Sequence, residues 1–136
     1  MSKRLLNRIA LITGSSSGLG QAIALAFATE GAIIFCVDLY PSSRNAINAT
    51  TGKADDIHNR VGGQGTHEKI RQAGGEATYH RADLTKSREV EFAVRACVAR
   101  YGRLDVMVNN AGMYVWGSLD SGFCVLCYAL RTSIPR

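Results

Sequence analysis

The sequence predicts an α/β fold with a doubly wound parallel sheet of about four strands. Short apolar runs, which are typical of strands buried on both faces, alternate along the chain with segments of helical periodicity. A glycine-rich segment at residues 14–20 separates the first apolar run from the first helical segment, as in a βαβ unit. The 136 residues, of which 46% are hydrophobic, are enough for one domain with a substantial core.

The first three predicted elements form one βαβ unit. Residues 8–13 are a largely apolar run that predicts a buried strand. Residues 18–30 predict a helix, and Gly31 stands where a glycine commonly ends a helix. The apolar positions of this helix are Leu19, Ile23, Ala26 and Phe27. Residues 32–37 predict a second buried strand, which ends at Asp38.

A polar segment separates this unit from the next elements. Residues 41–66 contain four glycines and little apolar periodicity, so we interpret them as a long surface insertion. Residues 67–73 predict the end of a short helix, and Gly74 and Gly75 predict a turn. Residues 77–80 then predict a third strand that leads to Asp83.

A longer helix and a fourth strand complete the alternating pattern. Ser87 is expected to cap a helix that runs to about Tyr101. We expect the buried face of this helix to contain Val90, Val94, Cys97 and Val98. Residues 104–108 predict the fourth strand, which the segment Asn109-Asn110-Ala111-Gly112 follows. The expected order of the strands in the sheet is three, two, one, four.

The segment from Thr13 to Gly20 is the first candidate binding site. It lies between the first strand and the first helix, where backbone N–H groups and the helix dipole can hold a pyrophosphate. Gly14 allows the tight turn, Gly18 lets a phosphate approach the backbone, and Gly20 allows close packing. The candidate binding residues are Gly14, Ser16, Ser17, Gly18, Leu19 and Gly20. The alternative is an ordinary loop that needs glycines at positive φ.

Two other phosphate-binding motifs do not fit this sequence. In the motif Gly-x-Gly-x-x-Gly, counted from Gly18, the place of the last glycine is taken by Ile23. A P-loop fails because Gly52-Lys53 is followed by Ala54 rather than by serine or threonine. We therefore do not expect a kinase or an ATPase.

Asp38 is the second candidate, because it ends a strand 18 residues after Gly20. An acidic residue at about this spacing hydrogen-bonds the ribose hydroxyls of a bound dinucleotide. Its carboxylate would repel the 2′-phosphate of NADP, so the sequence favours NAD as the cofactor. Arg44 could relieve that repulsion, but it lies six residues further on in the polar insertion. The alternative for Asp38 is a solvated loop carboxylate.

These motifs together resemble the short-chain dehydrogenase/reductase family. The resemblance covers roughly residues 8–120 and rests on Thr13-Gly14-x-x-x-Gly18-x-Gly20, Asp38, Asp83-Leu84 and Asn109-Asn110-Ala111-Gly112, in this order. It implies a Rossmann-like, NAD(P)-binding domain at residues 1–120 that is incomplete, with about four strands. It also implies that Asp83 and Leu84 contact the adenine, and that Asn110, Ala111 and Gly112 line the cofactor cleft.

The same resemblance implies an oxidoreductase acting on alcohol and carbonyl groups. Its chemistry needs a Tyr whose pKa is lowered by a Lys four residues later, and a Ser that polarises the carbonyl. The residues four positions after the five tyrosines are Arg44, Asp83, Asp105, Ser118 and Thr132. We therefore assign no catalytic residue and expect a chain that binds NAD(H) but ends before the catalytic residues and is inactive alone. The alternative is a non-catalytic nucleotide-binding or interaction module that pairs with a full-length homologue.

Charge and hydropathy exclude several other partners. The net charge of +5 is spread from Lys3 to Arg136, without a basic block or interleaved aromatic residues, so nucleic-acid binding is not expected. No apolar run approaches the roughly 18 residues of a membrane span. We therefore expect a cytoplasmic protein without a membrane partner. Homo-oligomer formation is expected, if at all, in a full-length form.

The tail and the cysteines carry no predicted site. Residues 121–136 depart from the family pattern, and we expect them to be irregular. Cys124-x-x-Cys127 lacks the second pair of ligands that a zinc site needs, so no metal site is predicted. All four cysteines are expected to be reduced.

Overall fold

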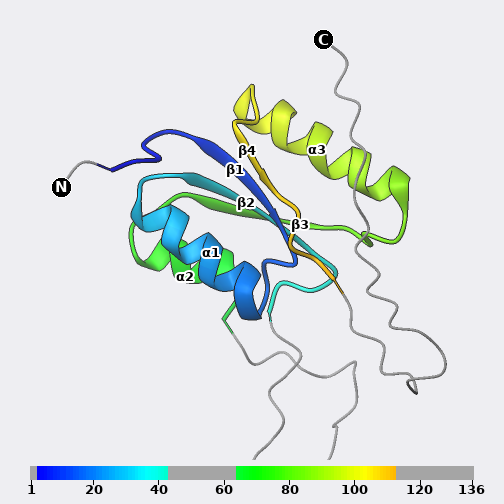
Figure 1. Ribbon diagram of the computed structural model, residues 1–136, viewed down its shortest axis with the longest axis horizontal. Coiled ribbons are helices and arrows are strands. Elements are labelled where there is room, and N and C mark those ends of the chain that lie inside the picture. Colours follow the sequence, from blue (N-terminus) through cyan, green and yellow to red (C-terminus); the bar gives the residue numbers. More distant parts are fainter. Residues whose placement is uncertain (1–2, 43–63, 113–136) are drawn as a thin grey trace, which may run out of the picture.

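The computed structural model describes residues 3–42 and 64–112, and these fold into a parallel sheet between two layers of helices (Figure 1). In chain order the elements are β1 (Ile9–Thr13), α1 (Gly18–Thr29), β2 (Ile33–Asp38), α2 (Thr66–Gln72), β3 (Ala77–Arg81), α3 (Ser87–Tyr101) and β4 (Val106–Val108). Within the described residues the sheet has four strands in the order β3-β2-β1-β4. The predicted fold class and strand order are confirmed.

Parallel pairing brings the carboxyl ends of the strands to one edge of the sheet. Thr13 of β1 pairs with Val37 of β2, and Ile12 of β1 pairs with Val108 of β4. Asp38 then lies one residue beyond the pair with Thr13, in register with Arg81 of β3. Ligands of open α/β sheets bind at this edge, so the sheet places the candidate segments where a ligand is expected.

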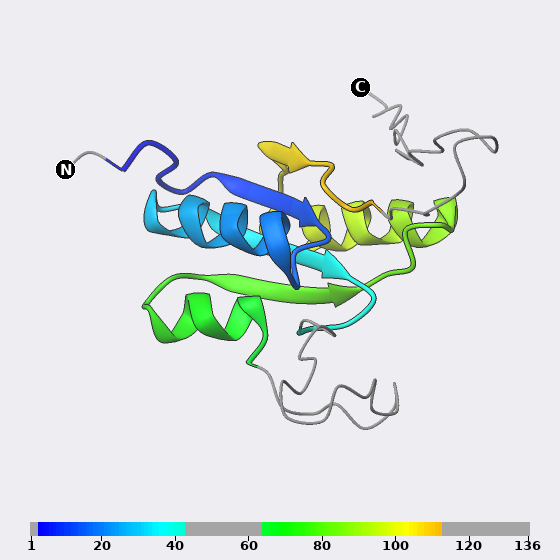
Figure 2. The ribbon, with the colours of Figure 1, turned by 60° about the horizontal axis from the view of Figure 1, so that its bottom comes forward.

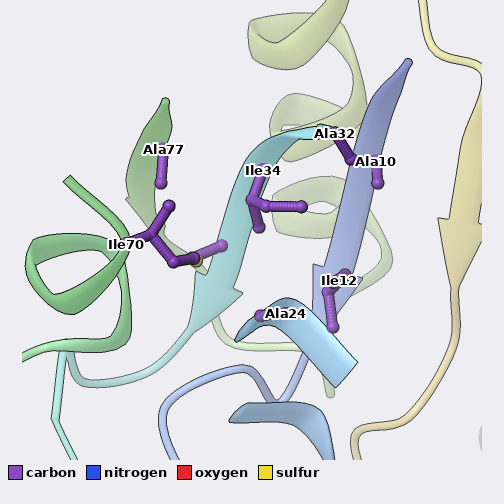
Figure 3. Close-up of a cluster of buried hydrophobic side chains, with 8 residues drawn as sticks. Ala10, Ile12, Ala24, Ala32, Ile34, Ile70 and Ala77 are labelled. Atoms are coloured by element: carbon purple, nitrogen blue, oxygen red, sulfur yellow. The ribbon is translucent and has the colours of Figure 1, made fainter. Parts of the chain in front are cut away.

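Side chains of the central strands point alternately to the two faces of the sheet and pack into two separate hydrophobic cores, one on each face. Helices α1 and α2 cover one face, and α3 covers the other (Figures 1 and 2). The first core contains Ala10, Ile12, Ala24, Ala32, Ile34, Cys36, Ile70 and Ala77, most of which Figure 3 labels. The second contains Ile9, Leu11, Phe35, Val37, Ala82, Ala93 and Cys97. Strands buried on both faces explain the continuous apolar runs of the sequence.

Two glycines follow the ends of helices, and for Gly31 the sequence predicts this position. Gly31 follows α1 with φ of 89°, and Gly102 follows α3 with φ of 80°. The Gly102 N–H donates to the carbonyl oxygen of Val98, 2.7 Å away. Only a residue that tolerates the left-handed region reverses the chain at this point without strain.

The predicted cap of α3 is wrong. Ser87 is the first residue of the helix, and the N-cap is Lys86, whose side chain makes no capping hydrogen bond. Instead, the Glu89 carboxylate turns back and accepts a hydrogen bond of 2.6 Å from the backbone N–H of Asp83. Asp83 lies before the helix, so this hydrogen bond joins the first turn of α3 to the residues after β3 and does not satisfy an N–H group of the helix itself.

One residue predicted for the buried face of α3 is also wrong, and one apolar position of α1 lies outside the core. Val98 is 40% exposed, because the buried stripe of α3 runs through Val90, Ala93 and Cys97 and Val98 lies beside it. Leu19 is 69% exposed, since the buried positions of α1 are Gly20 and Ala24. Leu19 therefore belongs to the edge of the sheet and not to the core.

Several predictions concern residues outside the described ones. These are the greater part of the insertion (residues 43–63), the domain boundary at residue 120 and the irregular tail at residues 121–136. In the described residues, the helices are too short or too polar to cross a membrane.

Candidate dinucleotide-binding site

A cleft of about 600 Å³ opens at the carboxyl edge of the sheet. Four segments line it: the turn between β1 and α1, the end of β2, the residues after β3 and the residues after β4. The lining residues are Gly14, Ser17, Gly18, Leu19, Asp38, Leu39, Ala82, Asp83, Leu84, Thr85, Asn110, Ala111 and Gly112. The fold therefore gathers into one cleft segments that lie up to about 100 residues apart in the sequence.

The turn between β1 and α1 presents unsatisfied backbone donors to this cleft. Gly14 and Gly18 have φ of 65° and 52°, and the Gly14 N–H is used by the carbonyl oxygen of Val37, 2.9 Å away. The N-cap of α1 is Ser17, whose side chain makes no capping hydrogen bond, and the first turn carries no acidic residue. The first N–H groups of α1 and its positive dipole end thus remain available to an anion.

Asn110 joins the turn to the residues after β4 by hydrogen bonds. Its Nδ2 donates to the carbonyl oxygens of Thr13, at 3.1 Å, and Gly14, at 3.4 Å. In return, Thr13 Oγ1 accepts hydrogen bonds from the backbone N–H groups of Asn110, at 3.0 Å, and Ala111, at 3.1 Å. Gly20 packs directly on the Gly14 carbonyl, where no side chain would fit. These contacts fix the shape of the turn without using the donors that face the cleft.

Asp38 lies in direct contact with the turn. Its Oδ2 accepts a hydrogen bond of 3.1 Å from the Ser16 N–H, and its Oδ1 accepts one of 2.8 Å from the Leu39 N–H. The Tyr79 hydroxyl donates to the Asp38 carbonyl oxygen at 3.1 Å. The turn and the strand tip are therefore on the same side of the molecule, as a shared dinucleotide site requires. Each carboxylate oxygen keeps a lone pair for a further donor.

Asp83 lies beside the cleft, and its carboxylate accepts two hydrogen bonds from Thr85. Its Oδ1 accepts hydrogen bonds from the Thr85 hydroxyl, at 2.7 Å, and the Thr85 N–H, at 3.0 Å. These hydrogen bonds, with the nearby ammonium of Lys86, hold the pKa of the Asp83 carboxyl below its usual value. The Leu84 side chain follows it and contributes apolar surface to the cleft.

Ten of the twelve predicted binding residues line the cleft, and the other two lie behind it. Ser16, which is 5% exposed, supports Asp38 through its N–H, and Gly20 is buried against the turn. The sequence analysis missed Leu39, Ala82 and Thr85, which also line the cleft. Each is adjacent or close to a predicted site residue just past a strand, so the strand ends would have identified them.

In the described residues, no group of three or more His, Cys, Asp or Glu side chains is arranged to hold a metal ion. Cys124 and Cys127 lie outside the described residues. The two described cysteines, Cys36 and Cys97, are buried free thiols whose pKa burial raises to about 11. They lie in the two cores and do not line the cleft.

The family model for short chain dehydrogenases matches residues 8–61 and 58–123 of this sequence. The chain belongs to the short-chain dehydrogenase family. Members of this family are oxidoreductases that bind nicotinamide dinucleotide cofactors. The resemblance that the motifs predict is confirmed. The alternative, a non-catalytic nucleotide-binding or interaction module that pairs with a full-length homologue, is not favoured.

Three individual relatives of this short-chain dehydrogenase show how similar the sequences are and how much of each chain is covered. It is 32% identical to the short-chain dehydrogenase/reductase homolog YusS of Bacillus subtilis over 108 residues, which are 79% of this chain and 83% of that protein. It is 36% identical to D-threitol dehydrogenase of Mycolicibacterium smegmatis over 113 residues, 81% of this chain and 35% of that protein. It is 35% identical to an uncharacterized oxidoreductase of Methylorubrum extorquens over 120 residues, 88% of this chain. The chain spans 41% of the length of that oxidoreductase.

Solved structures agree with the fold. A dehydrogenase/reductase from Sinorhizobium meliloti superimposes with a TM-score of 0.64 at 33% identity, covering 88% of this chain and 40% of that one. A hydroxysteroid dehydrogenase from Escherichia coli superimposes with a TM-score of 0.61 at 30% identity, covering 82% of this chain and 40% of that one. Both likenesses concern less than half of the solved chain.

Proposed function

We propose that this chain is the nucleotide-binding part of a short-chain dehydrogenase and that it binds NAD in the cleft at the carboxyl edge of its sheet. One observation carries the proposal: the Asp38 carboxylate is hydrogen-bonded to the same turn that presents the open N-terminus of α1. A dinucleotide needs both features close together, because its diphosphate seeks backbone donors while its adenosine ribose seeks a carboxylate.

The residues of the cleft fit the parts of a dinucleotide. The N–H groups at Ser17, Gly18 and Leu19 would hold the diphosphate, since no acidic side chain in the first turn of α1 opposes an anion. Asp38 would accept hydrogen bonds from the ribose hydroxyls. The apolar side chains of Leu39 and Leu84 would flank the adenine. When bound, NAD supplies a hydride acceptor for the oxidation of an alcohol carbon.

The same carboxylate supports a preference for NAD over NADP. A 2′-phosphate on the ribose would place its negative charge next to Asp38, whose oxygens are fixed by the N–H groups of Ser16 and Leu39. Repulsion between like charges at such distances amounts to about 1 kcal/mol or more near a protein surface, which is roughly a factor of ten in affinity.

The 136 residues lack the tyrosine and lysine pair that hydride transfer in this family requires. None of the five tyrosines in the 136 residues is followed by a lysine four positions later. A positioned lysine is what lowers the pKa of such a tyrosine, and burial instead raises the pKa of Tyr79 to about 12, so that it transfers protons poorly at neutral pH. We therefore propose cofactor binding without hydride transfer for this sequence.

Calorimetric titration of the purified 136-residue chain with NAD and NADP tests both parts of the proposal. We expect NAD to bind at least about tenfold more tightly than NADP. Absence of NAD binding would overturn the proposed function, and equal affinities would overturn the preference. A parallel assay of NADH formation from a panel of alcohols is expected to show no turnover, and measurable turnover would contradict the proposed lack of a catalytic tyrosine.

A further inference from the structure

Thr66 is a buried polar residue that connects the far end of the insertion to the glycine turn. It is the first residue of α2 and is 1% exposed. Its Oγ1 donates a hydrogen bond of 2.7 Å to the carbonyl oxygen of Ser15, a residue 51 positions earlier in the chain. Thr66 does not line the cleft, so any effect that it has on a ligand must pass through the turn.

Gln21 fixes the direction of that hydrogen bond. Its Nε2 donates to Thr66 Oγ1 at 2.8 Å and also to the Ser16 carbonyl oxygen at 3.3 Å. Because Oγ1 already accepts from Gln21, its own proton is free to point at Ser15. Gln21 and Thr66 together therefore hold two consecutive carbonyl groups of the turn from the side away from the cleft.

The Ser15–Ser16 peptide is held from both sides. In a planar trans peptide the C=O and N–H groups point in opposite directions, and the described residues contain no cis peptide bond. Thr66 holds the C=O of this peptide, and its N–H donates to Oδ2 of Asp38 at 3.1 Å. Rotation of the peptide would break both hydrogen bonds together, so the Thr66 hydroxyl and the Asp38 carboxylate are mechanically linked.

We propose that Thr66 is a positioning residue that fixes the Asp38 carboxylate through the Ser15–Ser16 peptide and thereby sets the preference for NAD over NADP. This inference rests on the proposed function. A carboxylate with a fixed orientation meets the ribose hydroxyls without ordering cost and cannot turn away from a 2′-phosphate. A carboxylate that has lost its hydrogen bond from the Ser16 N–H can turn away from the ribose. This rotation weakens NAD binding and relieves the repulsion of the 2′-phosphate of NADP.

Three variants separate positioning from general stability. Thr66→Val keeps the shape of the side chain and removes the hydroxyl, whereas Thr66→Ser keeps the hydroxyl. Thr78→Val is the matched control, because the Thr78 hydroxyl bonds the Tyr101 hydroxyl at 2.8 Å and contacts neither the turn nor Asp38. Thr66 begins α2, whereas Thr78 lies in β3 and bonds α3, so Thr78→Val removes a threonine hydroxyl without touching the glycine turn. A purely structural effect would lower the thermal midpoint without changing selectivity.

The measurements are the dissociation constants for NAD and NADP, obtained by calorimetry on the full chain. Thr66→Val is expected to weaken NAD binding about five- to tenfold and NADP binding less, so that the ratio of the two constants falls. Thr66→Ser should restore the ratio to within about twofold, and Thr78→Val should leave it unchanged. An unchanged ratio in folded Thr66→Val would overturn the proposal. If Thr66→Val does not fold, Gln21→Ala decides in the same way, since it removes the donor that orients Thr66.

Hydrogen exchange of the Ser16 amide provides a readout that needs no ligand. The wild-type amide is expected to be protected by Asp38, and Thr66→Val should exchange it about tenfold faster while Thr78→Val should not. Equal exchange in all variants would overturn the link between Thr66 and Asp38. A wild-type chain that binds neither dinucleotide would refute the proposed function instead, so the two failures are distinguishable.

Discussion

A β-carbon on Gly20 would lie 2.1 Å from the carbonyl oxygen of Gly14. It would also lie 2.5 Å from Nδ2 of Asn110, the atom that ties the turn to the residues after β4. The first turn of α1 therefore contacts the glycine turn without any intervening side chain. The shape of the glycine turn and its hydrogen bond to Asn110 both depend on this close contact.

Gly20→Ala is expected to destabilise the fold by about 1–3 kcal/mol, because the added carbon forces the turn or the helix to move. Gly112→Ala is the control, since a β-carbon there has its nearest neighbour at 4.0 Å, the carbonyl oxygen of Asn110. Chemical denaturation of both variants measures the difference. If Gly20→Ala unfolded at the same denaturant concentration as the wild type, the close packing described above would be incorrect.

Gly18→Ala separates the backbone role of a glycine from its role in binding. Gly18 and Gly102 both have positive φ, and a β-carbon would meet no atom within 4 Å at either position. Alanine should therefore cost about 1 kcal/mol of stability at both sites, through backbone strain alone. Only Gly18 lines the cleft, so only Gly18→Ala is expected to reduce NAD affinity, by about tenfold or more. Equal NAD affinities in the two variants would argue against diphosphate binding at the turn.

Asp38→Asn is expected to reduce or abolish the preference for NAD over NADP. The asparagine oxygen can still accept the Ser16 N–H, but the negative charge that opposes a 2′-phosphate is gone. NADP affinity relative to NAD should rise about tenfold. Glu91→Gln, which changes an exposed carboxylate paired with Arg95 on α3, serves as the charge-matched control and should leave the ratio unchanged. A constant ratio in Asp38→Asn would exclude Asp38 as the specificity residue.

Much of the site could be predicted from the sequence because its signals are local. The glycine turn, Asp38 and the Asn110 segment each lie at or just past the carboxyl end of a strand, and parallel strands bring such positions to one edge. The strand order followed from the alternating pattern of apolar runs and helical periodicity. The end of α1 at Gly31 followed from the backbone freedom of glycine.

The contacts that join distant segments could not be predicted. Thr66 reads as a residue of a polar insertion, and nothing near it in the sequence indicates a bond to Ser15. The predicted cap of α3 failed for a related reason, because Ser87 matches the pattern of a cap, but the helix already begins at Ser87 and its N-cap is Lys86. Leu19 shares the helical spacing of the other apolar residues of α1. It is exposed and lines the cleft, because the first turn of α1 lies at the edge of the sheet. Side-chain pairing and the start of a helix relative to the sheet are decided by the tertiary structure.

Asp105 is expected to make stability depend on pH in the acid range. The Ile9 N–H, 2.8 Å from Oδ2, together with Arg103 and Arg8, holds the pKa of the Asp105 carboxyl below its usual value of about 4. A carboxyl whose folded pKa is depressed stabilises the fold above its unfolded pKa, and this stability is lost as the pH falls through the folded pKa. The thermal midpoint of unfolding should therefore decrease as the pH is lowered below about 4.

Asp105→Asn should lower the thermal midpoint at neutral pH and flatten its decline in acid. Glu30, Asp83 and Glu89 also have lowered pKa values, so part of the decline should remain. Glu91→Gln is again a suitable control. A decline as steep in Asp105→Asn as in the wild type would show that the Asp105 hydrogen bonds do not contribute.

Titration of the ¹⁵N-labelled chain with NAD, followed by the backbone amide resonances, tests the central claim most directly. Binding at the open N-terminus of α1 predicts the largest shifts at the amides of Ser17, Gly18, Leu19 and Gly20, with further changes at Ser16 and Leu39, whose N–H groups hold Asp38. Shifts confined to α3, or no shifts at saturating NAD, would contradict the assignment of this cleft as the dinucleotide site.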